Sequence, residues 1–488
     1  MTKTEIRIFI LIALMGFLLR IYALTRFPMF TDEAIYAHWA KELINGTLSP
    51  FISISDGKTP LFVWTISAVV KLGATYINAG RIISALSFIG TGYFIFALSK
   101  KSMKNLWTFV PTLFYALSPF TIFYERMGLM DSLLTFFSTG FLFFVYQFIT
   151  MNGSLYTAMI SGLLLTLAFM TKPSALIFVY TSVCIPLFYL FTNRKKALFS
   201  LLLSIPTLVI LFLISRSSGF SAYSFKNMEF TYPLSTNWSI LWNNMFMNID
   251  MLFPAMTVYF LPLFLLFPFA VLYLMRKKQY GMLVLIMLYM CIPVAIIMVF
   301  GRIVFSRYFL SFTPLLFIAS GYALMHFSYL KNNILKNFLL GAGLLGTILY
   351  FVSGTARTLL NPQNAFLSSQ DRWQYITSTA SGFGINETAT FLKKLDKKLI
   401  VVTTQNFGNL PYAFNFAFEH NSNIAVQGTW LEDPKTIRSI ISKTNTPVYI
   451  VYNLPVQKLP KSSRLLKKIF NYTRPDQLSG IGVYELTR

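Results

Sequence analysis

Residues 281–300 read GMLVLIMLYMCIPVAIIMVF and contain no charged side chain. As an α-helix, a stretch of this length covers about 30 Å, the thickness of the hydrocarbon core of a bilayer. Comparable apolar runs lie at 6–23 and 197–214. The whole chain of 488 residues is 55% hydrophobic and only 12% charged, which no ordinary soluble domain would be. The sequence therefore predicts a polytopic α-helical membrane protein.

The positive charges lie mostly in short loops between apolar runs. A formal net charge of +24 would otherwise suggest a nucleic-acid partner, which we do not expect. The basic loop clusters are Lys100, Lys101 and Lys104; Arg194, Lys195 and Lys196; Arg276, Lys277 and Lys278; and Lys331 with Lys336. Together with Lys3 and Arg7, they predict a multi-pass protein of the plasma membrane whose N-terminus is cytoplasmic.

The apolar runs predict about eleven spans. We place them at 6–24, 82–99, 106–122, 132–149, 155–171, 174–192, 197–215, 254–275, 280–300, 305–326 and 335–353. The run at 60–72 is too short to span and is expected to lie along the outer surface. An odd number of spans puts the C-terminus outside. We therefore expect a transmembrane domain at 1–355 with an outer loop at 27–80.

The composition changes after Ser353, where Asn, Lys, Thr and Asp become frequent. Residues 356–488 are expected to form a small extracytoplasmic α/β domain. The predicted strands are 399–404, 424–427, 448–452 and 483–486, and the predicted helices are 386–397, 409–419 and 434–443. Alternation of strands and helices favours parallel pairing of the strands.

Polar residues that do not anchor cytoplasmic loops gather on the predicted outer side. They are Asp32, Glu33, Lys58, Asp131, Arg302, Arg307 and Tyr308. A carboxylate at the membrane surface can remove the proton of an acceptor, and Asp32 is the candidate base. The side chains of Lys58, Arg307 and Tyr308 can offset the charge that develops on a departing phosphate. These residue types suit transfer of a sugar from a polyprenyl phosphate.

Several motifs along the first 310 residues resemble those of one enzyme family. They are Asp32-Glu33, Lys58-Thr59-Pro60-Leu61, Arg81, Glu125-Arg126, Asp131-Ser132-Leu133-Leu134, Thr171-Lys172-Pro173 and Arg307-Tyr308. Together they resemble the membrane-embedded GT-C glycosyltransferases, which include the protein O-mannosyltransferases of glycosyltransferase family 39 and the lipid A aminoarabinose transferases. The resemblance implies a GT-C fold and a sugar transferase that acts on a lipid-phosphate donor.

The resemblance also implies roles for single residues. It makes Asp32 the catalytic base and Asp131 a second catalytic carboxylate beside the sugar. Glu33, Lys58, Arg302, Arg307 and Tyr308 are then the expected substrate-binding residues, with Lys58 on the donor phosphate. The implied reaction inverts the anomeric carbon and needs no nucleotide sugar. The implied partners are the polyprenyl-phosphate sugar, membrane lipids and an acceptor that is a protein, a glycolipid or an envelope glycan.

A metal site is not expected from histidines, because His38, His326 and His420 lack ligand spacing. The sequence leaves open a divalent cation, Mg²⁺ or Mn²⁺, bridged by Asp32 and Asp131. No cofactor is otherwise implied.

Simpler interpretations compete for the same residues. Asp32 and Glu33 suit the first turn of a helix, and Asp131 suits a helix N-cap. Lysines near span ends commonly extend toward the interface, and we favour this role for Lys172. Arg302 and Arg307 are also compatible with an aromatic belt. At the level of function, the alternative is a transporter or flippase of a lipid-linked glycan, because charges within a membrane also mark transport pathways.

Overall fold

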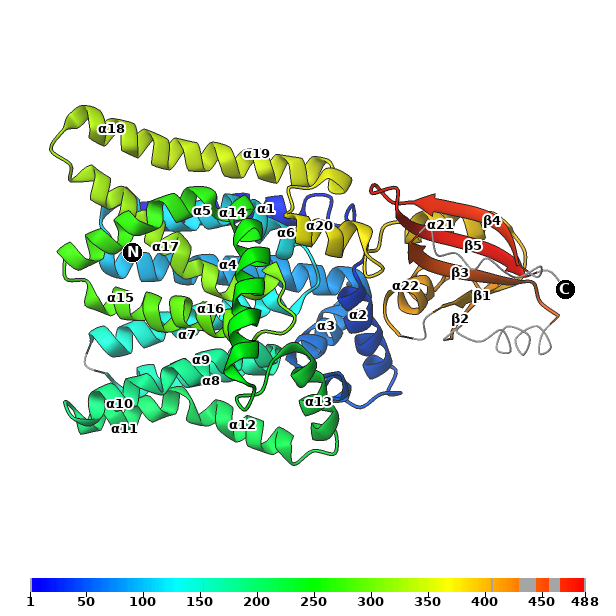
Figure 1. The fold of residues 1–488 in the computed structure, drawn as a ribbon, viewed down its shortest axis with the longest axis horizontal. Helices are drawn as coiled ribbons and strands as arrows, with labels where there is room; N and C mark the ends of the chain where they lie inside the picture. Colours follow the sequence, from blue (N-terminus) through cyan, green and yellow to red (C-terminus); the bar gives the residue numbers. More distant parts are fainter. Residues whose placement is uncertain (1, 152, 405–406, 430–444, 456–465, 487–488) are drawn as a thin grey trace.

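The computed structural model describes residues 2–151, 153–404, 407–429, 445–455 and 466–486. A long helical bundle carries a small sheet domain at one end (Figure 1). The N-terminus and α18 lie at the opposite end of the bundle. Lys100 of one basic loop forms an ion pair with Glu5 near that N-terminus. The predicted helical membrane protein with a small C-terminal domain is confirmed in outline.

Seven helical segments of the described chain are long and apolar enough to cross a membrane. They are Tyr76–Ser102 (α4), Met130–Thr150 (α7), Pro173–Leu190 (with α9 and α10), Trp238–Arg276 (α14), Tyr280–Phe300 (with α15 and α16), Ser306–Ser328 (with α17) and Asn333–Leu360 (with α18 and α19). The bent pair Arg194–Leu203 and Ile205–Ser215 (α11 and α12) gives an eighth if both parts form one span.

Three other predicted spans have different forms. Helix α1 (Lys3–Ile21) carries charged residues at both ends. The run at 106–122 breaks at Ser118, giving α5 (Val110–Leu117) and α6 (Pro119–Tyr124). Helix α8 (Leu155–Thr171) is 17 residues long. The count of about eleven spans therefore stays a prediction.

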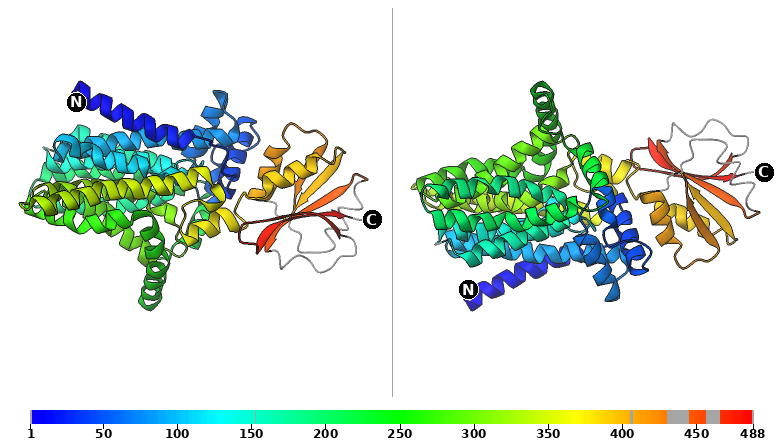
Figure 2. Two further views of the ribbon diagram at one scale, coloured as in Figure 1. Left: turned by 90° about the horizontal axis from the view of Figure 1, so that it is seen from above. Right: turned by 90° about the horizontal axis from the view of Figure 1, so that it is seen from below.

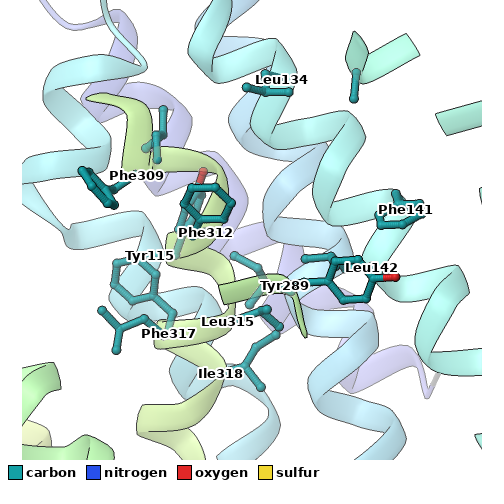
Figure 3. Packing of buried hydrophobic residues seen from close by; sticks show 14 of the residues in the cluster. Tyr115, Leu134, Phe141, Leu142, Tyr289, Phe309, Phe312, Leu315, Phe317 and Ile318 are labelled. Atoms are coloured by element: carbon teal, nitrogen blue, oxygen red, sulfur yellow. The ribbon is translucent and has the colours of Figure 1, made fainter. Parts of the chain in front are cut away.

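Helix α17 (Thr313–Ser328) is the centre of the bundle. Almost every residue of this helix is buried, and it packs against α4, α5 and α14. Figure 3 shows Leu315, Phe317 and Ile318 of this helix in the core, where the ring of Phe317 packs against Tyr115. Gly321 allows close packing, since a Cβ there would lie 2.9 Å from Met103 Cε. The central helix thus holds the preceding turn, residues 306–312, in a fixed place.

Helix α14 (Trp238–Arg276) is longer than the predicted span 254–275. Its chain is kinked at Phe260, where φ is −124° and ψ is 15°, close to Pro262. The part before the kink projects sideways from the bundle as a green helix in both views of Figure 2. Asn244 and Asn248 tie this part to the carbonyl of Gly301.

Short helices cover the end of the bundle that meets the sheet domain. They are α2 (Thr31–Ile44), α3 (Leu61–Lys71), α13 (Phe220–Phe230) and α20 (Ser369–Arg372). Helix α3 is the predicted surface helix and is 11 residues long.

The C-terminal domain is a five-stranded sheet in the order β2-β1-β3-β5-β4. Its strands are β1 (Leu399–Thr403), β2 (Ile424–Gly428), β3 (Val448–Pro455), β4 (Leu466–Thr473) and β5 (Ser479–Leu486). Strand β1 is parallel to β2 and β3, whereas β5 is antiparallel to β3 and β4. The expectation of a parallel sheet is therefore wrong for half of the pairings.

Strand β4 was not expected from the sequence. Its adjacent lysines, Lys467 and Lys468, interrupt the apolar pattern, and such lysines are usual on an edge strand. Helices α21 (Ile385–Lys393) and α22 (Asn409–Ala417) contribute to the hydrophobic core of the domain. The predicted helix at 434–443 lies outside the described residues.

Candidate active site

Asp32 lies in the first turn of α2, and its partner is an arginine from a distant part of the chain. Arg307 belongs to a 3₁₀ helix, η6 (Ser306–Phe312), directly before α17. Arg307 Nη1 is 2.9 Å from Asp32 Oδ2, and the side chains are 10% and 19% exposed. The ion pair is thus mostly shielded from water but not sealed.

The guanidinium of Arg307 has an unused donor. Its Nε–H group is buried and has no hydrogen-bond acceptor among the described residues, whereas Nη1 faces Asp32 in the ion pair. The ring of Phe30 lies under the guanidinium, with its centroid 5.6 Å from Cζ. Buried donors without acceptors are costly, so this guanidinium is suited to an additional anionic ligand.

Glu33 is adjacent to Asp32 and has very different surroundings. Its Oε1 accepts hydrogen bonds from Arg81 Nε and from the N–H of Gly128, both at 2.7 Å. Its Oε2 accepts from Arg81 Nη2 and from the N–H of Phe30, both at 2.9 Å. The expected contact of Glu33 with substrate is therefore not supported by its geometry, since both oxygens are occupied and the carboxylate is buried.

Two glycines make the Glu33 network possible. A Cβ on Gly80 of α4 would lie 3.2 Å from Gly128 Cα, so the backbone of α4 and the backbone of the turn before α7 are nearly in contact. This close approach brings Arg81 and the N–H of Gly128 to the same carboxylate. Glu33 therefore fixes α2 to α4 and to the turn before α7.

Asp131 lies in the first turn of α7 and pairs with Lys172. Lys172 Nζ is 2.5 Å from Asp131 Oδ1, with side-chain exposures of 17% and 5%. The ammonium of Lys172 also lies 4.5 Å from the centroid of the Tyr308 ring. The sequence favoured an interfacial role for Lys172. The structure corrects this, because the chain reversal after α8 brings the lysine to the start of α7.

Lys58 follows a sharp turn that needs a glycine. Gly57 has φ of 73°, which is left-handed, and its carbonyl accepts a hydrogen bond from Asn227 Nδ2 of α13 at 3.1 Å. The turn directs Lys58 Nζ to Asp56 and to the Trp39 ring, 5.6 Å from its centroid. Helix α3 starts three residues later, at Leu61.

Arg302 lies apart from this cluster. It is exposed, in the bend before η6, with its guanidinium 5.8 Å from the centroid of the Tyr232 ring. Its backbone N–H bonds to the carbonyl of Phe230. Residues 303–305, between Arg302 and the start of η6, are not helical, so the two arginines do not share a helix face. The substrate role expected for Arg302 has no support from this position.

The charges around Asp32 act together on its pKa. Burial alone would raise the pKa of this carboxyl, but Arg307, Lys58 and Lys172 outweigh it and hold the pKa below its usual value. For Lys172, burial lowers the pKa more than the nearby Asp131 raises it, and Arg307 lowers it further. The structure thus brings Asp32, Asp131, Lys58 and Arg307 into one electrostatic unit and adds Lys172.

The carboxylates do not make a metal cage in the described part of the chain. No group of three His, Cys, Asp or Glu side chains gathers there with a suitable arrangement. Asp32 and Asp131 each face a positive group, which a divalent cation would have to displace. These residues do not fit a bridged Mg²⁺ or Mn²⁺, and no step below uses one.

Comparisons with known proteins agree with this architecture. The family model described as dolichyl-phosphate-mannose-protein mannosyltransferase matches residues 57–221. No curated protein matches the sequence.

Solved structures match over nearly the whole chain. ArnT from Cupriavidus metallidurans bound to undecaprenyl phosphate has a TM-score of 0.60 at 15% identity, over 99% of this chain and 98% of that one. The oligosaccharyltransferase AglB from Archaeoglobus fulgidus, in complex with an inhibitory peptide and a dolichol-phosphate, has a TM-score of 0.55 at 11% identity, over 100% of this chain and 74% of that one. The resemblance expected from the motifs is thereby confirmed for the architecture: the chain has the GT-C fold of membrane-embedded glycosyltransferases.

Proposed function

We propose that the protein is an inverting glycosyltransferase that moves a sugar from a polyprenyl-phosphate donor to an acceptor on the outer face of the membrane. The observation that carries the proposal is the buried Arg307 guanidinium, which pairs with Asp32 through Nη1 and keeps an unused Nε–H donor. Lys58 and Lys172 add positive charge around the same carboxylate. A phosphate oxygen would supply the acceptor that the arginine lacks.

The donor phosphate is placed against Arg307 in this proposal. As the bond from the anomeric carbon to the phosphate oxygen breaks, that oxygen takes the electron pair and gains negative charge. Arg307 and Lys58 stabilise this charge, and their effect is larger in a site with little water. Tyr308, next to Arg307, keeps the binding role that the motif implies.

Asp32 is the base on the acceptor side. The acceptor oxygen or nitrogen forms its bond to the anomeric carbon while its proton passes to Asp32. The leaving group is the free polyprenyl phosphate, and the configuration at the anomeric carbon inverts in the single displacement. Such general base catalysis contributes about 10²–10⁴-fold.

Donor binding and base strength are coupled in this arrangement. Nearby positive charges hold the pKa of Asp32 low, which makes the carboxylate a weak base. A phosphate that draws Arg307 to itself offsets part of that positive charge. The carboxylate then becomes a stronger base when the donor is present, which links proton removal to a loaded site.

Asp131 is proposed to act beside Asp32 on the sugar or the acceptor. It is held by Lys172, which also contributes to the field around Asp32. An ion pair of this kind keeps the carboxylate charged and oriented at the start of α7.

The donor class has support from structural neighbours. The ArnT structure contains undecaprenyl phosphate, and the AglB structure contains a dolichol-phosphate. The proposed partners are therefore a polyprenyl-phosphate sugar, membrane lipids and an acceptor among proteins, glycolipids and envelope glycans.

We further propose that residues 1–355 are the transmembrane catalytic domain and residues 356–488 an extracytoplasmic domain. Basic residues near the N-terminus and at 100–104, 194–196, 276–278 and 331–336 would then face the cytoplasm of a plasma-membrane protein. The sheet domain and the site lie at the other end of the bundle.

The test uses vesicles from cells that lack the protein. Feeding the cells a radiolabelled sugar loads the polyprenyl-phosphate pool, and fusion with proteoliposomes adds the purified protein. The wild type is expected to move label to an acceptor and to release free lipid phosphate. Asp32→Asn is expected to do neither, while the exposed carboxylate variant Asp250→Asn behaves as the wild type. Normal transfer by Asp32→Asn would refute the assignment of the base.

The same vesicles separate transfer from transport. A flippase would change the leaflet that holds the labelled donor and leave the donor intact. Release of lipid phosphate that depends on the protein is the outcome that favours a transferase over the flippase.

A further inference from the structure

One segment of the chain contacts the elements that carry both partners of the Asp32–Arg307 pair. Residues 368–382, here called the clasp, connect the helical bundle to the sheet domain and include α20. Neither the motifs nor the proposed reaction gives this segment a role.

The clasp holds the Arg307 side of the pair. Gln370 Nε2 donates to the carbonyl of Val304 at 2.8 Å, and Ser306 Oγ donates to Gln370 Oε1 at 3.2 Å. The clasp is also fixed to the bundle, because Tyr259 of α14 donates its hydroxyl to the buried Asp371 at 2.6 Å. Gln370 thus bonds on both sides of the bend that leads into Arg307.

The clasp also holds the Asp32 side. The carbonyl of Ala380 accepts two hydrogen bonds from Thr31, from its backbone N–H at 3.1 Å and from its Oγ1 at 2.9 Å. Thr31 is the first residue of α2 and precedes Asp32 directly. A Cβ on Gly382 would lie only 2.2 Å from the carbonyl oxygen of Met29, so the two backbones touch just before α2.

An aromatic contact joins the two sides. Tyr375 of the clasp packs on Phe30, with ring centroids 4.6 Å apart. The guanidinium of Arg307 lies over the same Phe30 ring. Tyr375, Phe30 and Arg307 are all buried. The clasp therefore reaches the guanidinium and the start of α2 through one continuous set of contacts.

The sheet domain fixes the clasp by side chains that bond to its carbonyls. Asn453 of β3 donates to Thr379 at 2.7 Å, and Asn409 of α22 donates to Ser381 at 2.9 Å. Asn453 is itself held by the buried Arg474, whose Nη2 donates to Asn453 Oδ1 at 2.8 Å. The position of residues 379–382 thus depends on the fold of the C-terminal domain.

We propose that the clasp is a positioning element of the active site, through which the C-terminal domain sets the geometry of the Asp32–Arg307 pair. Thr31, Gln370, Gly382 and Asn453 are positioning residues that act through Asp32 and Arg307. The inference rests on the proposed function, since it concerns the placing of its base and its phosphate ligand. A base misplaced by about 1 Å can lose about 100-fold in rate.

The experiment compares pairs of matched variants in the vesicle assay. Thr31→Val removes the Oγ1 bond and keeps the shape, whereas Thr31→Ser keeps the bond. Gly382→Ala puts a Cβ against Met29, whereas Gly346→Ala puts one in open space. For each variant, kcat, KM for the labelled donor and the melting temperature are measured on the full-length protein.

We expect kcat to fall roughly 10-fold in Thr31→Val and more in Gly382→Ala, with KM within about 2-fold of the wild type. Thr31→Ser and Gly346→Ala should keep wild-type kcat. Asn453→Ala, in the sheet domain, should also lower kcat. This variant tests whether the sheet domain acts on the active site through the clasp.

Normal kcat in Thr31→Val and Asn453→Ala, with only a lower melting temperature, would overturn the inference and leave the clasp as a structural support. Failure of the proposed function looks different, since the wild type itself would then release no lipid phosphate. Should Gly382→Ala not fold, the threonine and asparagine variants still decide the question.

Discussion

Two carboxylate–arginine pairs from adjacent residues of α2 have opposite characters. Glu33 and Arg81 have side-chain exposures of 3% and 2%, and both oxygens of Glu33 accept hydrogen bonds from more than one donor. Asp32 and Arg307 are more open, and the buried Nε–H group of Arg307 has no acceptor among the described residues. A saturated pair has no capacity left for a ligand. An unsaturated pair at the edge of a site does, so we assign the first to structure and the second to catalysis.

The largest expected effect removes the charge of the unsaturated pair. Asp32→Asn keeps the size of the side chain and should reduce transfer by about 10²–10⁴-fold, because the base is lost. Its thermal stability should change little, since the pair is partly exposed and the amide oxygen of asparagine can still accept a hydrogen bond from Arg307. Transfer rate per folded molecule and a melting curve measure both effects. A folded variant with normal transfer would break the comparison.

Glu33→Gln should give the reverse result. The variant leaves Arg81 buried without a charged partner, which costs about 3–5 kcal/mol of unfolding free energy. Chemical unfolding in detergent micelles measures this loss. The fraction that stays folded should retain most of its transfer rate. A stable but inactive Glu33→Gln protein would show that Glu33 contacts the substrate after all.

Gly80→Ala sharpens the comparison with a smaller effect. The new Cβ would meet Gly128 Cα at 3.2 Å, so the backbones around the Glu33 network must separate. A cost of about 1–3 kcal/mol is expected for such overpacking. The matched control is Gly92→Ala in the same helix, where the nearest atom, Thr112 Cγ2, lies at 3.6 Å. Equal stability of the two variants would contradict the close approach.

Lys58→Ala should shift a pH profile without abolishing the reaction. In the wild type, burial raises the pKa of Asp32, but Arg307, Lys58 and Lys172 together lower it more. The carboxylate therefore stays charged at pH values below the ordinary pKa of an aspartate. Loss of Lys58 raises this pKa, and protonation then removes the base at a higher pH. The acid limb of the pH profile of kcat/KM should therefore move to higher pH.

The control for this profile is Lys226→Ala, which removes a half-buried lysine paired with Glu229. Its acid limb should stay in place. An unchanged limb in Lys58→Ala would mean that Lys58 does not act on Asp32.

Sequence patterns predicted much of the candidate site, because its residues belong to motifs that can be recognised although they lie far apart in the chain. Asp32, Lys58, Asp131, Arg307 and Tyr308 were expected to meet, and the structure brings them together. The patterns did not separate Asp32 from Glu33, since both are acids in one helical turn. Only the placing of Arg81 and Gly128 decides which acid is saturated.

Other features depend on packing that no local pattern contains. In the sequence, Lys172 has the pattern of an interfacial lysine. In the structure, the chain reversal after α8 brings it into an ion pair with Asp131. From the sequence, Arg302 and Arg307 have the same expected role in substrate binding, but the bend before η6 separates them in the structure. The clasp matches none of the motifs quoted from the sequence, and its contacts to α2 and to the sheet domain run largely through backbone carbonyls of residues 379–381.

In the fold, long apolar runs predicted the helical bundle, with seven or eight of about eleven predicted spans long and apolar enough to cross a membrane in the described chain, whereas the mixed sheet was harder to predict. The alternation of helix and strand predicted parallel pairing, which holds for β1 with its neighbours. The antiparallel hairpin of β4 and β5 was missed because Lys467 and Lys468 disrupt the apolar pattern of an edge strand.

Binding of undecaprenyl phosphate to matched arginine variants tests the central claim most directly. The central claim is that the lipid phosphate binds at Arg307. The full-length protein is titrated with this lipid, and the dissociation constants of wild type, Arg307→Gln and Arg302→Gln are compared. Loss of a hydrogen-bonded charge contact should weaken binding by about 10-fold or more in Arg307→Gln. Arg302→Gln should bind as the wild type does. Equal binding by all three proteins would contradict the account.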